Sequence, residues 1–422
     1  MRVVTGADIL KEKIGFKSNF ALQKKVSDII KNVVSQGDKA LFDYTEKFDN
    51  VQLQNLRVPK QAIQEAGDNL NPSERELFEH AIENIKRFHK KQLNKTWKDS
   101  FDDGTELGQI VRPIERVGIY IPGGTAVYPS SLIMNAVPAQ IAGVSSIAVV
   151  SPPANISLPH EMVLATCSLL ELYEVYNIGG AHSIAALAFG TETIEPVYKI
   201  TGPGNEYVAE AKRQVFGQVG IDSIAGPSEI IILHDETDVP VKYIVRDMLS
   251  QAEHDPKAKS IFITTSVNLA ENVANQLEKI APCLPRKEII MKSLKNNGLI
   301  ICINKIEEGI DIVNKIAPEH LELIVKEESI IDQIKNSGAI FVGKWSSEPV
   351  GDYLAGPNHV LPTNGTAKYS SPLGVYDFQK YSSFIRYSKE RLQKEGRMIV
   401  DFAELEQLYA HAAAIEARLE DL

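Results

Sequence analysis

The sequence predicts an α/β protein with two doubly wound, Rossmann-like units, a helical N-terminal segment and a helical C-terminal tail. Short apolar runs typical of buried parallel strands alternate with helical stretches in two separate series. Before the first series and after the second, apolar residues recur at helical spacing only. The chain of 422 residues is also too long for one small core. Two α/β units with helical ends account for all three observations.

Two long helices are expected near the N-terminus. The first begins near Ser18 and ends at Gly37, because glycine commonly follows the last turn of a helix. The second covers about 73–91. Together they predict a mainly helical layer ahead of the first strand. The apolar positions of the first helix are Leu22, Val26, Ile29, Ile30, Val33 and Val34.

The two series of strands follow and meet near 225–228. A helix over 240–253 fits within the second series, with Thr237 or Asp238 as its cap and Pro240 in its first turn. Beyond Tyr376 the alternation ends. The expected strands are 117–121, 146–150, 174–178 and 197–200 in the first series, and 229–233, 260–264, 299–303, 321–325 and 339–342 in the second.

The C-terminal tail reads as a short amphipathic helical segment. Phe402, Leu405, Leu408 and Tyr409 recur at helical spacing. Glu406 and His411 are set among them. A tail of this kind often packs on a partner subunit.

Composition narrows the classes of function. Apolar residues make up 44% and charged residues 24%, which is ordinary for a globular enzyme. The net charge of −10 disfavours nucleic acid as a partner, since phosphate binding needs clustered Lys and Arg. Residues 1–20 contain no uninterrupted apolar segment, so neither a signal peptide nor a membrane anchor is expected. A cytoplasmic location is the default expectation.

The cysteines carry no recognisable motif. Cys167, Cys283 and Cys302 are odd in number, widely spaced and set in apolar segments. A disulfide framework or a cysteine zinc site is therefore not expected. Reduced, buried thiols are predicted.

Two short motifs combine a histidine with a carboxylate or an amide. Gln251 and His254 are three apart at the end of a predicted helix, so they can reach one ion together, and their oxygen and nitrogen atoms suit zinc. Glu319 and His320 are neighbours, which would diverge on a helix, so we expect them on a loop where both address one substrate. The alternative is that each histidine is only a capping or solvated residue.

A glycine-rich stretch with little periodicity adds further candidates. It contains Gly351-Asp352-Tyr353 and Gly356-Pro357-Asn358-His359. A buried loop of this kind is more often functional than the elements around it. Asp352 and His359 are therefore candidate site residues.

Three glycine-containing loops fall at predicted strand-to-helix junctions, at 120–124, 179–182 and 202–205. Such junctions lie at the carboxyl edge of a parallel sheet, where helix N-termini favour phosphate. Each loop alone could be only a tight turn. None has the G-x-G-x-x-G spacing, so a nucleotide cannot be inferred from spacing. Three such loops at one sheet edge nevertheless favour a nucleotide or another anion as the ligand.

At this point the chain resembles the histidinol dehydrogenase family over nearly its whole length. The resemblance implies oxidation of L-histidinol to L-histidine through L-histidinal, with two NAD reduced in turn, as the last two steps of histidine biosynthesis. The matching motifs are RP at 112–113, VGIYIPGG at 117–124, GPGN at 202–205, AGPSE at 225–229, LSQAEH at 249–254, APEHLE at 317–322, GDY at 351–353 and GPNHVLPT at 356–363.

The resemblance also implies the metal site. One zinc ion per subunit would be bound by Gln251, His254, Asp352 and His411, the last supplied by the neighbouring subunit's tail. The same ligand types also accept Mn or Co. A site shared between chains requires a homodimer.

Catalytic roles are implied for two residues. His320 would take the alcohol proton as hydride leaves, and Glu319 would activate the water that adds to the aldehyde. The residues implied to hold substrate are Ser228, Gln251, His254, His320, Asp352, His359, Glu406 and His411, with Glu406 as a partner for the ammonium group.

NAD contacts are implied for Tyr120 and Asn205. His182 departs from the family, which has Gln at this position. Histidine can still donate a hydrogen bond but is bulkier, so His182 is a doubtful cofactor residue.

The expected domains combine these assignments. Residues 1–16 form an N-terminal extension, and 17–117 with 229–373 form the main α/β domain that carries the metal and catalytic residues. Residues 118–228 form a second α/β domain with the NAD-binding loops. Residues 374–422 form the tail that packs on a partner.

Three other interpretations of the function fit the sequence less well. A cysteine nucleophile is the rival aldehyde chemistry, but none of the three cysteines lies in a motif that would lower its pKa. A relative that oxidises another polyol, such as a sulfonated propanediol, would favour a cationic residue where Glu406 stands. A non-catalytic metal- and nucleotide-binding protein would not need both Glu319 and His320.

Overall fold

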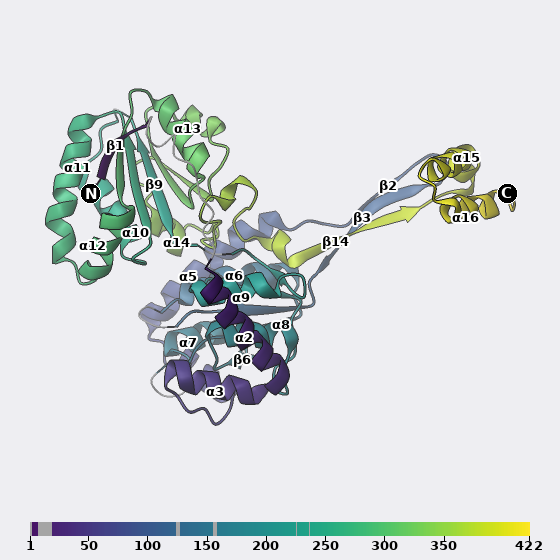
Figure 1. Cartoon of the computed structure of the whole chain (residues 1–422), viewed down its shortest axis with the longest axis horizontal. Coiled ribbons are helices and arrows are strands. Elements are labelled where there is room, and N and C mark those ends of the chain that lie inside the picture. Colours follow the sequence, from purple (N-terminus) through teal and green to yellow (C-terminus); the bar gives the residue numbers. More distant parts are fainter. Residues whose placement is uncertain (1, 7–18, 124–126, 155–157, 225, 236) are drawn as a thin grey trace.

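The computed structural model describes residues 2–6, 19–123, 127–154, 158–224, 226–235 and 237–422. It shows two α/β lobes and a long arm that carries the C-terminus at its tip (Figure 1). Most of the N-terminal extension, Gly124 of the first glycine loop and Ala225 at the junction of the units lie outside the described residues. The two doubly wound units and the helical tail are confirmed.

The larger sheet is wholly parallel and is buried on both faces. Alternate side chains of its central strands enter two separate cores, which is why these strands read as continuous apolar runs. In order across the sheet the strands are β1 (Arg2–Thr5), β11 (Leu299–Cys302), β10 (Lys259–Thr264), β9 (Glu229–His234), β12 (His320–Ile324) and β13 (Ala339–Val342). Helices α10 (Val241–Ala252), α11 (Val267–Ile280) and α12 (Lys287–Asn297) cover one face, and α13 (Ile306–Ile316) covers the other.

The smaller sheet repeats this topology. Numbered within each unit, the strands of both sheets follow the order 3-2-1-4-5, and β1 is an addition at one edge of the larger sheet. Across the smaller sheet the strands are β6 (Val175–Tyr176), β5 (Ser146–Val150), β4 (Arg116–Tyr120), β7 (Lys199–Thr201) and β8 (Gly220–Ile221). Helices α6 (Pro129–Ala142) and α7 (Glu161–Leu169) lie on one face, and α8 (Gly180–Phe189) and α9 (Glu206–Val215) on the other.

The N-terminal helices pack on the smaller lobe, which differs from the grouping of 17–117 with 229–373 that the sequence suggested. One pair shares the core of α8 and α9, and the other shares the core of α6 and α7. Helical periodicity reveals the apolar face of a helix but not the sheet that this face will cover. The helices are α2 (Phe20–Gln36), α3 (Asp38–Asp49), α4 (Lys60–Asp68) and α5 (Pro72–His89).

Local signals explain where several helices begin and end. Helix α2 ends at Gly37 as predicted, with the glycine at φ 55°. Helix α5 begins after Asn71, whose side chain accepts from the N–H of Glu74 while the Glu74 carboxylate accepts from the N–H of Asn71. The expected cap of α10 was wrong. Pro240 itself is the extended residue before the helix, and Thr237 instead donates to the side chain of Asp235.

The prediction that all three cysteines are buried was wrong for Cys283. Cys167 is fully buried in α7 and Cys302 is half-buried, but Cys283 is exposed. Its segment forms a short surface 3-10 helix, η2 (Ala281–Cys283).

The arm is a three-stranded antiparallel sheet capped by two helices (Figure 1). Its strands are β2 (Trp97–Ser100), β3 (Glu106–Pro113) and β14 (Gln379–Arg386), and its helices are α15 (Lys389–Leu405) and α16 (Tyr409–Leu419). The helices share a small core of Val400, Ala403 and Ala412, against which Ile415 packs. Leu405 is 83% exposed and Tyr409 is 67% exposed. The tip therefore leaves much of its apolar surface uncovered by its own chain.

Short elements complete the connections. They are α14 (Glu348–Tyr353), η1 (Lys90–Gln92), η3 (Glu328–Gln333), η4 (Thr366–Lys368) and η5 (Val375–Phe378).

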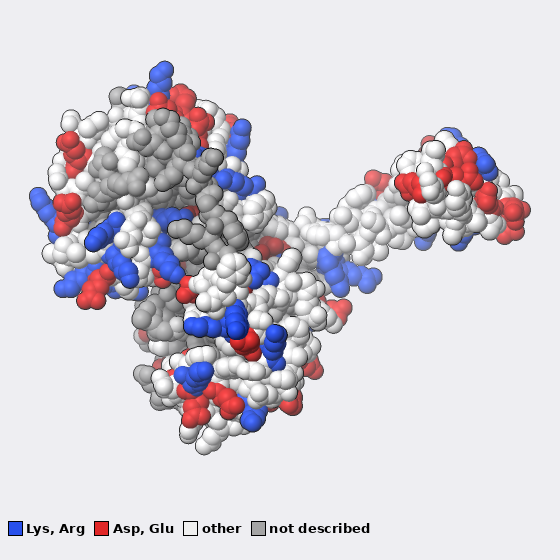
Figure 2. Space-filling model, in the orientation of Figure 1, with Lys and Arg blue, Asp and Glu red and all other residues white. Residues whose placement is uncertain are grey.

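Lys and Arg side chains are interspersed with acidic ones over the face in Figure 2 and do not form one continuous basic stripe. Among the described residues, no helix combines the length and apolar character needed to cross a bilayer.

Candidate active site

The predicted catalytic residues meet at the amino edge of the larger sheet. Ser228 and Glu319 lie directly before strands β9 and β12, and Gln251 lies in the last turn of α10 with His254 just beyond it. His320 had been expected on a loop, but it is the first residue of β12. Because β9 and β12 are neighbouring parallel strands, their starts lie side by side.

His320 is held in one tautomer. Its Nδ1 lies 3.2 Å from the backbone oxygen of Glu229, which can only accept, so Nδ1 carries the hydrogen. The other ring nitrogen, Nε2, is buried without a hydrogen-bond partner among the described residues and lies 3.9 Å from Asp352 Oδ1. Burial lowers the pKa of His320 to about 4. The ring is therefore neutral near pH 7, with a free lone pair on Nε2.

Glu319 is buried beside this imidazole. Its Oε2 lies 3.7 Å from His320 Nδ1 and accepts from the backbone N–H of Glu229 at 2.9 Å. Burial raises the pKa of Glu319 well above its usual value, although hydrogen bonds from Glu229 N–H and the Ser228 hydroxyl oppose the increase. Burial therefore favours the protonated form of this carboxyl group more than in an exposed glutamate.

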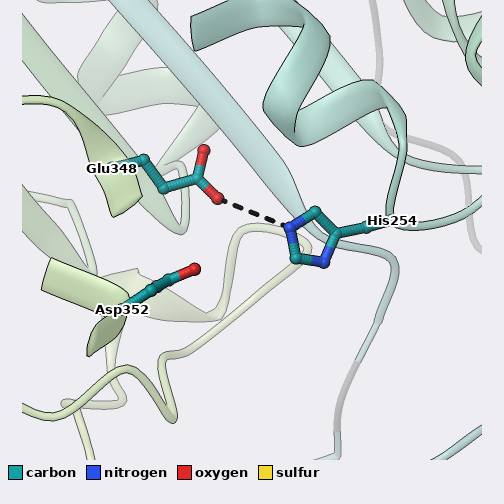
Figure 3. A group of neighbouring side chains, drawn as sticks. All are labelled: His254, Glu348 and Asp352. Atoms are coloured by element: carbon teal, nitrogen blue, oxygen red, sulfur yellow. Dashed lines mark ion pairs between the residues drawn. The ribbon is translucent and has the colours of Figure 1, made fainter. Parts of the chain in front are cut away.

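A cluster of possible metal ligands lies next to this pair. Ligand atoms of His254, Glu348 and Asp352 all lie within 4.8 Å of one another. Figure 3 shows the two carboxylates projecting from α14 towards the imidazole, with His254 Nε2 3.9 Å from Glu348 Oε1. Burial raises the pKa of Glu348 well above its usual value, and the neighbouring carboxylates, Asp352 first, raise it further. A cation would relieve this repulsion.

Gln251 is a further possible metal ligand beside Glu348. Its side chain is fully buried, with one end of the amide 2.6 and 3.0 Å from the Glu348 carboxylate oxygens and the other 2.6 Å from Glu229 N. With NH2 towards Glu348, both ends are hydrogen-bonded. With the amide oxygen towards Glu348, three oxygens face one another and only a cation stabilises them. Imidazole, carboxylate and amide oxygen together are a suitable set for zinc.

His359 lies against the same cluster. Its Nδ1 donates to the backbone oxygen of Asp352 at 2.9 Å, and its Nε2 is 3.4 Å from Ser131 Oγ. Burial lowers the pKa of His359, so the ring is neutral. His359 therefore fixes the segment that carries Asp352.

Two cavities adjoin these residues, and both lobes line them. One of about 570 Å³ lies beside His254 and is lined largely by apolar residues of α5 and α6. Another of about 430 Å³ lies beside His320, Asp352 and His359. The site therefore opens between the lobes, where a small molecule could bind.

The predicted cofactor loops lie at the carboxyl edge of the smaller sheet. Tyr120 ends β4, and Asn205 precedes α9 and caps it by accepting from Tyr207 N–H at 3.0 Å and Val208 N–H at 3.2 Å. Strands β4 and β7 are neighbours whose following helices cover opposite faces of the sheet. This is the switch point at which α/β folds bind their ligands.

The loop after β7 is fixed by a buried ion pair. Lys212 donates to the carbonyl oxygen of Gly202 at 3.0 Å, and Asp222 accepts from the N–H of Gly202 at 2.8 Å. Gly202 has φ 115°, and a Cβ there would lie 2.1 Å from the Tyr120 carbonyl oxygen. Only glycine allows the two cofactor loops to approach this closely.

His182 lies near these loops but is turned towards the protein interior. It is 1% exposed, its Nε2 is 3.4 Å from Thr45 Oγ1, and its ring is beside those of Tyr44 and Phe48. Burial lowers its pKa to about 3. Its Nδ1 is also buried, on the side of Gly180, and has no hydrogen-bond partner among the described residues.

Two predicted site residues are not brought to the site by their own chain. Glu406 and His411 are exposed at the tip of the arm, where Glu406 ends α15 and His411 lies in α16. Figure 1 shows how far the tip projects from the lobes.

Three further acids at or behind the metal cluster were not predicted from the sequence: Glu348 and Glu322 are buried, and Asp247 is half-buried. Glu348 is one turn before Asp352, Asp247 is one turn before Gln251, and Glu322 is two residues after His320 on the strand. Those spacings place each acid on the same face as a predicted site residue, which was the available signal. Glu322 Oε1 accepts from the N–H of Glu348 at 2.8 Å.

The chain has two Rossmann-like units, glycine loops at a switch point, and a neutral imidazole beside a cluster of possible metal ligands. This combination is typical of a metal-assisted dehydrogenase. The model of the family described as histidinol dehydrogenase matches residues 15–419. The chain is 51% identical to the histidinol dehydrogenase of Listeria monocytogenes serotype 4b, over 100% of both chains, and 49% identical to that of Bacillus subtilis, over 99% and 98%. The crystal structure of histidinol dehydrogenase from Elizabethkingia anophelis superposes with a TM-score of 0.93 at 35% identity, covering 100% of this chain and 98% of that one. The chain therefore belongs to the histidinol dehydrogenase family.

Proposed function

We propose that this protein oxidises L-histidinol to L-histidine through L-histidinal and reduces two NAD, which completes histidine biosynthesis. The observation that carries the proposal is the free, neutral Nε2 of His320 beside buried Glu319 and the His254, Glu348 and Asp352 cluster. The family uses NAD and zinc. An NADH-absorbance assay with L-histidinol, and with a sulfonated propanediol as the comparison, tests the assignment directly.

The metal site that we infer is shared between two subunits. Gln251, His254 and Asp352 supply three ligands from one chain, and the partner subunit's His411 supplies another. A zinc ion bound there, one per subunit, would orient the nitrogen atoms of the substrate. Holding the alcohol carbon in position in this way contributes several kcal/mol to lowering the barrier, within the roughly 7–11 kcal/mol available to oriented reactants.

His320 acts in the first oxidation. Its Nε2 removes the proton from the substrate hydroxyl, the C–H bond breaks, and the hydride passes to NAD to give L-histidinal. The bond from Nδ1 to the carbonyl of Glu229 keeps the lone pair on Nε2 and stabilises the ring as it gains the proton.

Glu319 acts in the second oxidation. Its carboxylate removes a proton from water as the water oxygen adds to the aldehyde carbon. As the water oxygen adds, the aldehyde oxygen takes the proton that His320 gained in the first oxidation, which returns His320 to its neutral form. The hydrate then loses its hydride to a second NAD as His320 takes a hydroxyl proton, which gives the carboxylic acid group of L-histidine. Loss of the remaining acidic proton to water leaves the carboxylate. NAD is bound by the loops of Tyr120 and Asn205, with His182 at the edge of that site.

Substrate contacts come from both chains. Ser228 and His359 lie at the amino edge of the larger sheet with the catalytic pair. Glu406 of the partner subunit offers a carboxylate to the substrate ammonium group. A sulfonated diol has no such cation, so this residue favours an amino alcohol.

The shape of the chain supports a homodimer. The exposed apolar residues of the tip accompany Glu406 and His411, and the apolar cavity of about 570 Å³ lies beside His254. Seating one tip beside the other subunit's cavity would bury that surface and bring His411 to the metal site.

The cysteines do not support a covalent aldehyde intermediate. Burial raises the pKa of the Cys167 and Cys302 thiols, and Cys283 is on the surface of η2. None of the three lies at the site, so Glu319 rather than a thiol serves the second step.

We expect His411→Ala to weaken zinc binding without unfolding the subunit. Loss of a residue that merely supports a ligand costs about 10–100-fold in metal affinity, so loss of a ligand should cost at least about 100-fold. His411 is exposed, so the variant should keep its melting temperature. Zinc titration by calorimetry measures the effect, with the exposed His80→Ala as the matched control. Unchanged zinc affinity in His411→Ala would contradict the shared site.

A further inference from the structure

We propose that Glu348 binds the metal, and that His254, Glu348 and Asp352 form a one-chain site which holds the ion before the partner's arm supplies His411. The inference rests on the proposed function only in assuming that the cluster takes zinc. It adds Glu348 to the implied metal ligands. It also implies that each subunit binds its metal before the dimer assembles.

The position of Glu348 points to a cation. The residue is 1% exposed, and its backbone N–H is anchored to Glu322 at 2.8 Å. Within the described ranges its one ion-pair partner is His254, at 3.9 Å. A buried carboxylate without a nearby Lys or Arg is costly unless a cation neutralises it.

Three groups from one chain already converge. His254 lies just beyond α10, while Glu348 and Asp352 share one face of α14, four residues apart (Figure 3). Their ligand atoms lie within 4.8 Å of one another. Two carboxylates also match the double charge of Zn²⁺, whereas Asp352 alone leaves half of it uncompensated.

Two further buried groups address the same space. Gln251 has one end of its amide 2.6 Å from Glu348 Oε1, and His320 Nε2 is unpartnered within the described part of the chain. Neither group belongs to the partner's arm. Each subunit therefore has a cation site that does not require the arm.

The test is a zinc titration of three full-length variants: His411→Ala, His411→Ala/Glu348→Gln and His411→Ala/Glu319→Gln. We expect His411→Ala to bind one Zn²⁺ per chain with reduced affinity. Adding Glu348→Gln should weaken binding by a further factor of about 100. Adding Glu319→Gln, an equally conservative change at a buried acid outside the cluster, should change it less than about threefold.

The proposal is overturned if Glu348→Gln and Glu319→Gln have equal effects, or if His411→Ala binds no zinc at all. Glu348→Asp keeps the negative charge, so this variant should bind zinc more tightly than Glu348→Gln. It tests the role of the carboxylate even if Glu348→Gln does not fold. If His411→Ala binds zinc as tightly as the wild type, the shared site fails, but the Glu348 comparison remains decisive for its own claim.

Discussion

Replacing Glu319 by glutamine is expected to stop the reaction after one oxidation. Glutamine has the same shape, and its oxygen can still accept from the N–H of Glu229, but it cannot take a proton from water. Oxidation of L-histidinal should slow by about 10²–10⁴-fold, the usual contribution of a general base. NADH formed per L-histidinol consumed should fall from two towards one, as measured by absorbance with product analysis.

The pH dependence and a neighbouring acid provide the controls. Because burial raises the pKa of Glu319, its carboxylate becomes available as pH rises, so the rate of histidinal oxidation should rise with pH in the wild type and lose that rise in Glu319→Gln. Glu322→Gln changes another buried acid, three residues after Glu319 in β12, and should keep a ratio of two. An unaltered rate with L-histidinal in Glu319→Gln would remove this residue from the mechanism.

Replacing His320 by asparagine is expected to slow both oxidations. The lone pair on Nε2 is the base for each hydroxyl proton, and asparagine offers no basic nitrogen. The fall should be about 10²–10⁴-fold with L-histidinol and with L-histidinal as substrate, in steady-state assays. Zinc should still bind, because His254, Glu348 and Asp352 remain in place.

His234→Asn is the matched control for this substitution. His234 is also buried in the larger sheet, but it is the last residue of β9 and so lies at the edge of the sheet opposite His320. Its two ring nitrogens lie within hydrogen-bonding distance of Thr264 and Thr237. Its replacement should lower stability and leave kcat within a few-fold of the wild type. Equal losses of activity in the two variants would mean that His320 serves only the fold.

The two α/β units were predictable because their strands are buried on both faces. Residues 230–233 and 261–263 are continuously apolar, and they form the centres of the strands Glu229–His234 and Lys259–Thr264. The arm gave no such signal. All residues of β2 are exposed, and most residues of β14 are exposed. Strands with water on both faces of the sheet show no alternation of apolar and polar residues in the sequence.

The site was predicted in its motifs but not in its surroundings. His320 was found as a histidine beside a carboxylate, and Asp352 as part of a glycine-rich stretch, before the resemblance to the family implied their roles. Glu348 belongs to no such motif, and only the fold reveals that its carboxylate meets His254 from α14. Burial of His182 against α3 could not be foreseen either, since α3 itself was not predicted.

The most direct test of the central claim is the number of NADH formed per L-histidinol consumed, with zinc-replete protein, after chelation and after zinc is restored. We predict a ratio near two that is lost on chelation and recovered with zinc. A ratio near one would mean that L-histidinal is released and would contradict the role of Glu319. Absence of NADH with zinc-replete protein would contradict the assignment of L-histidinol as substrate.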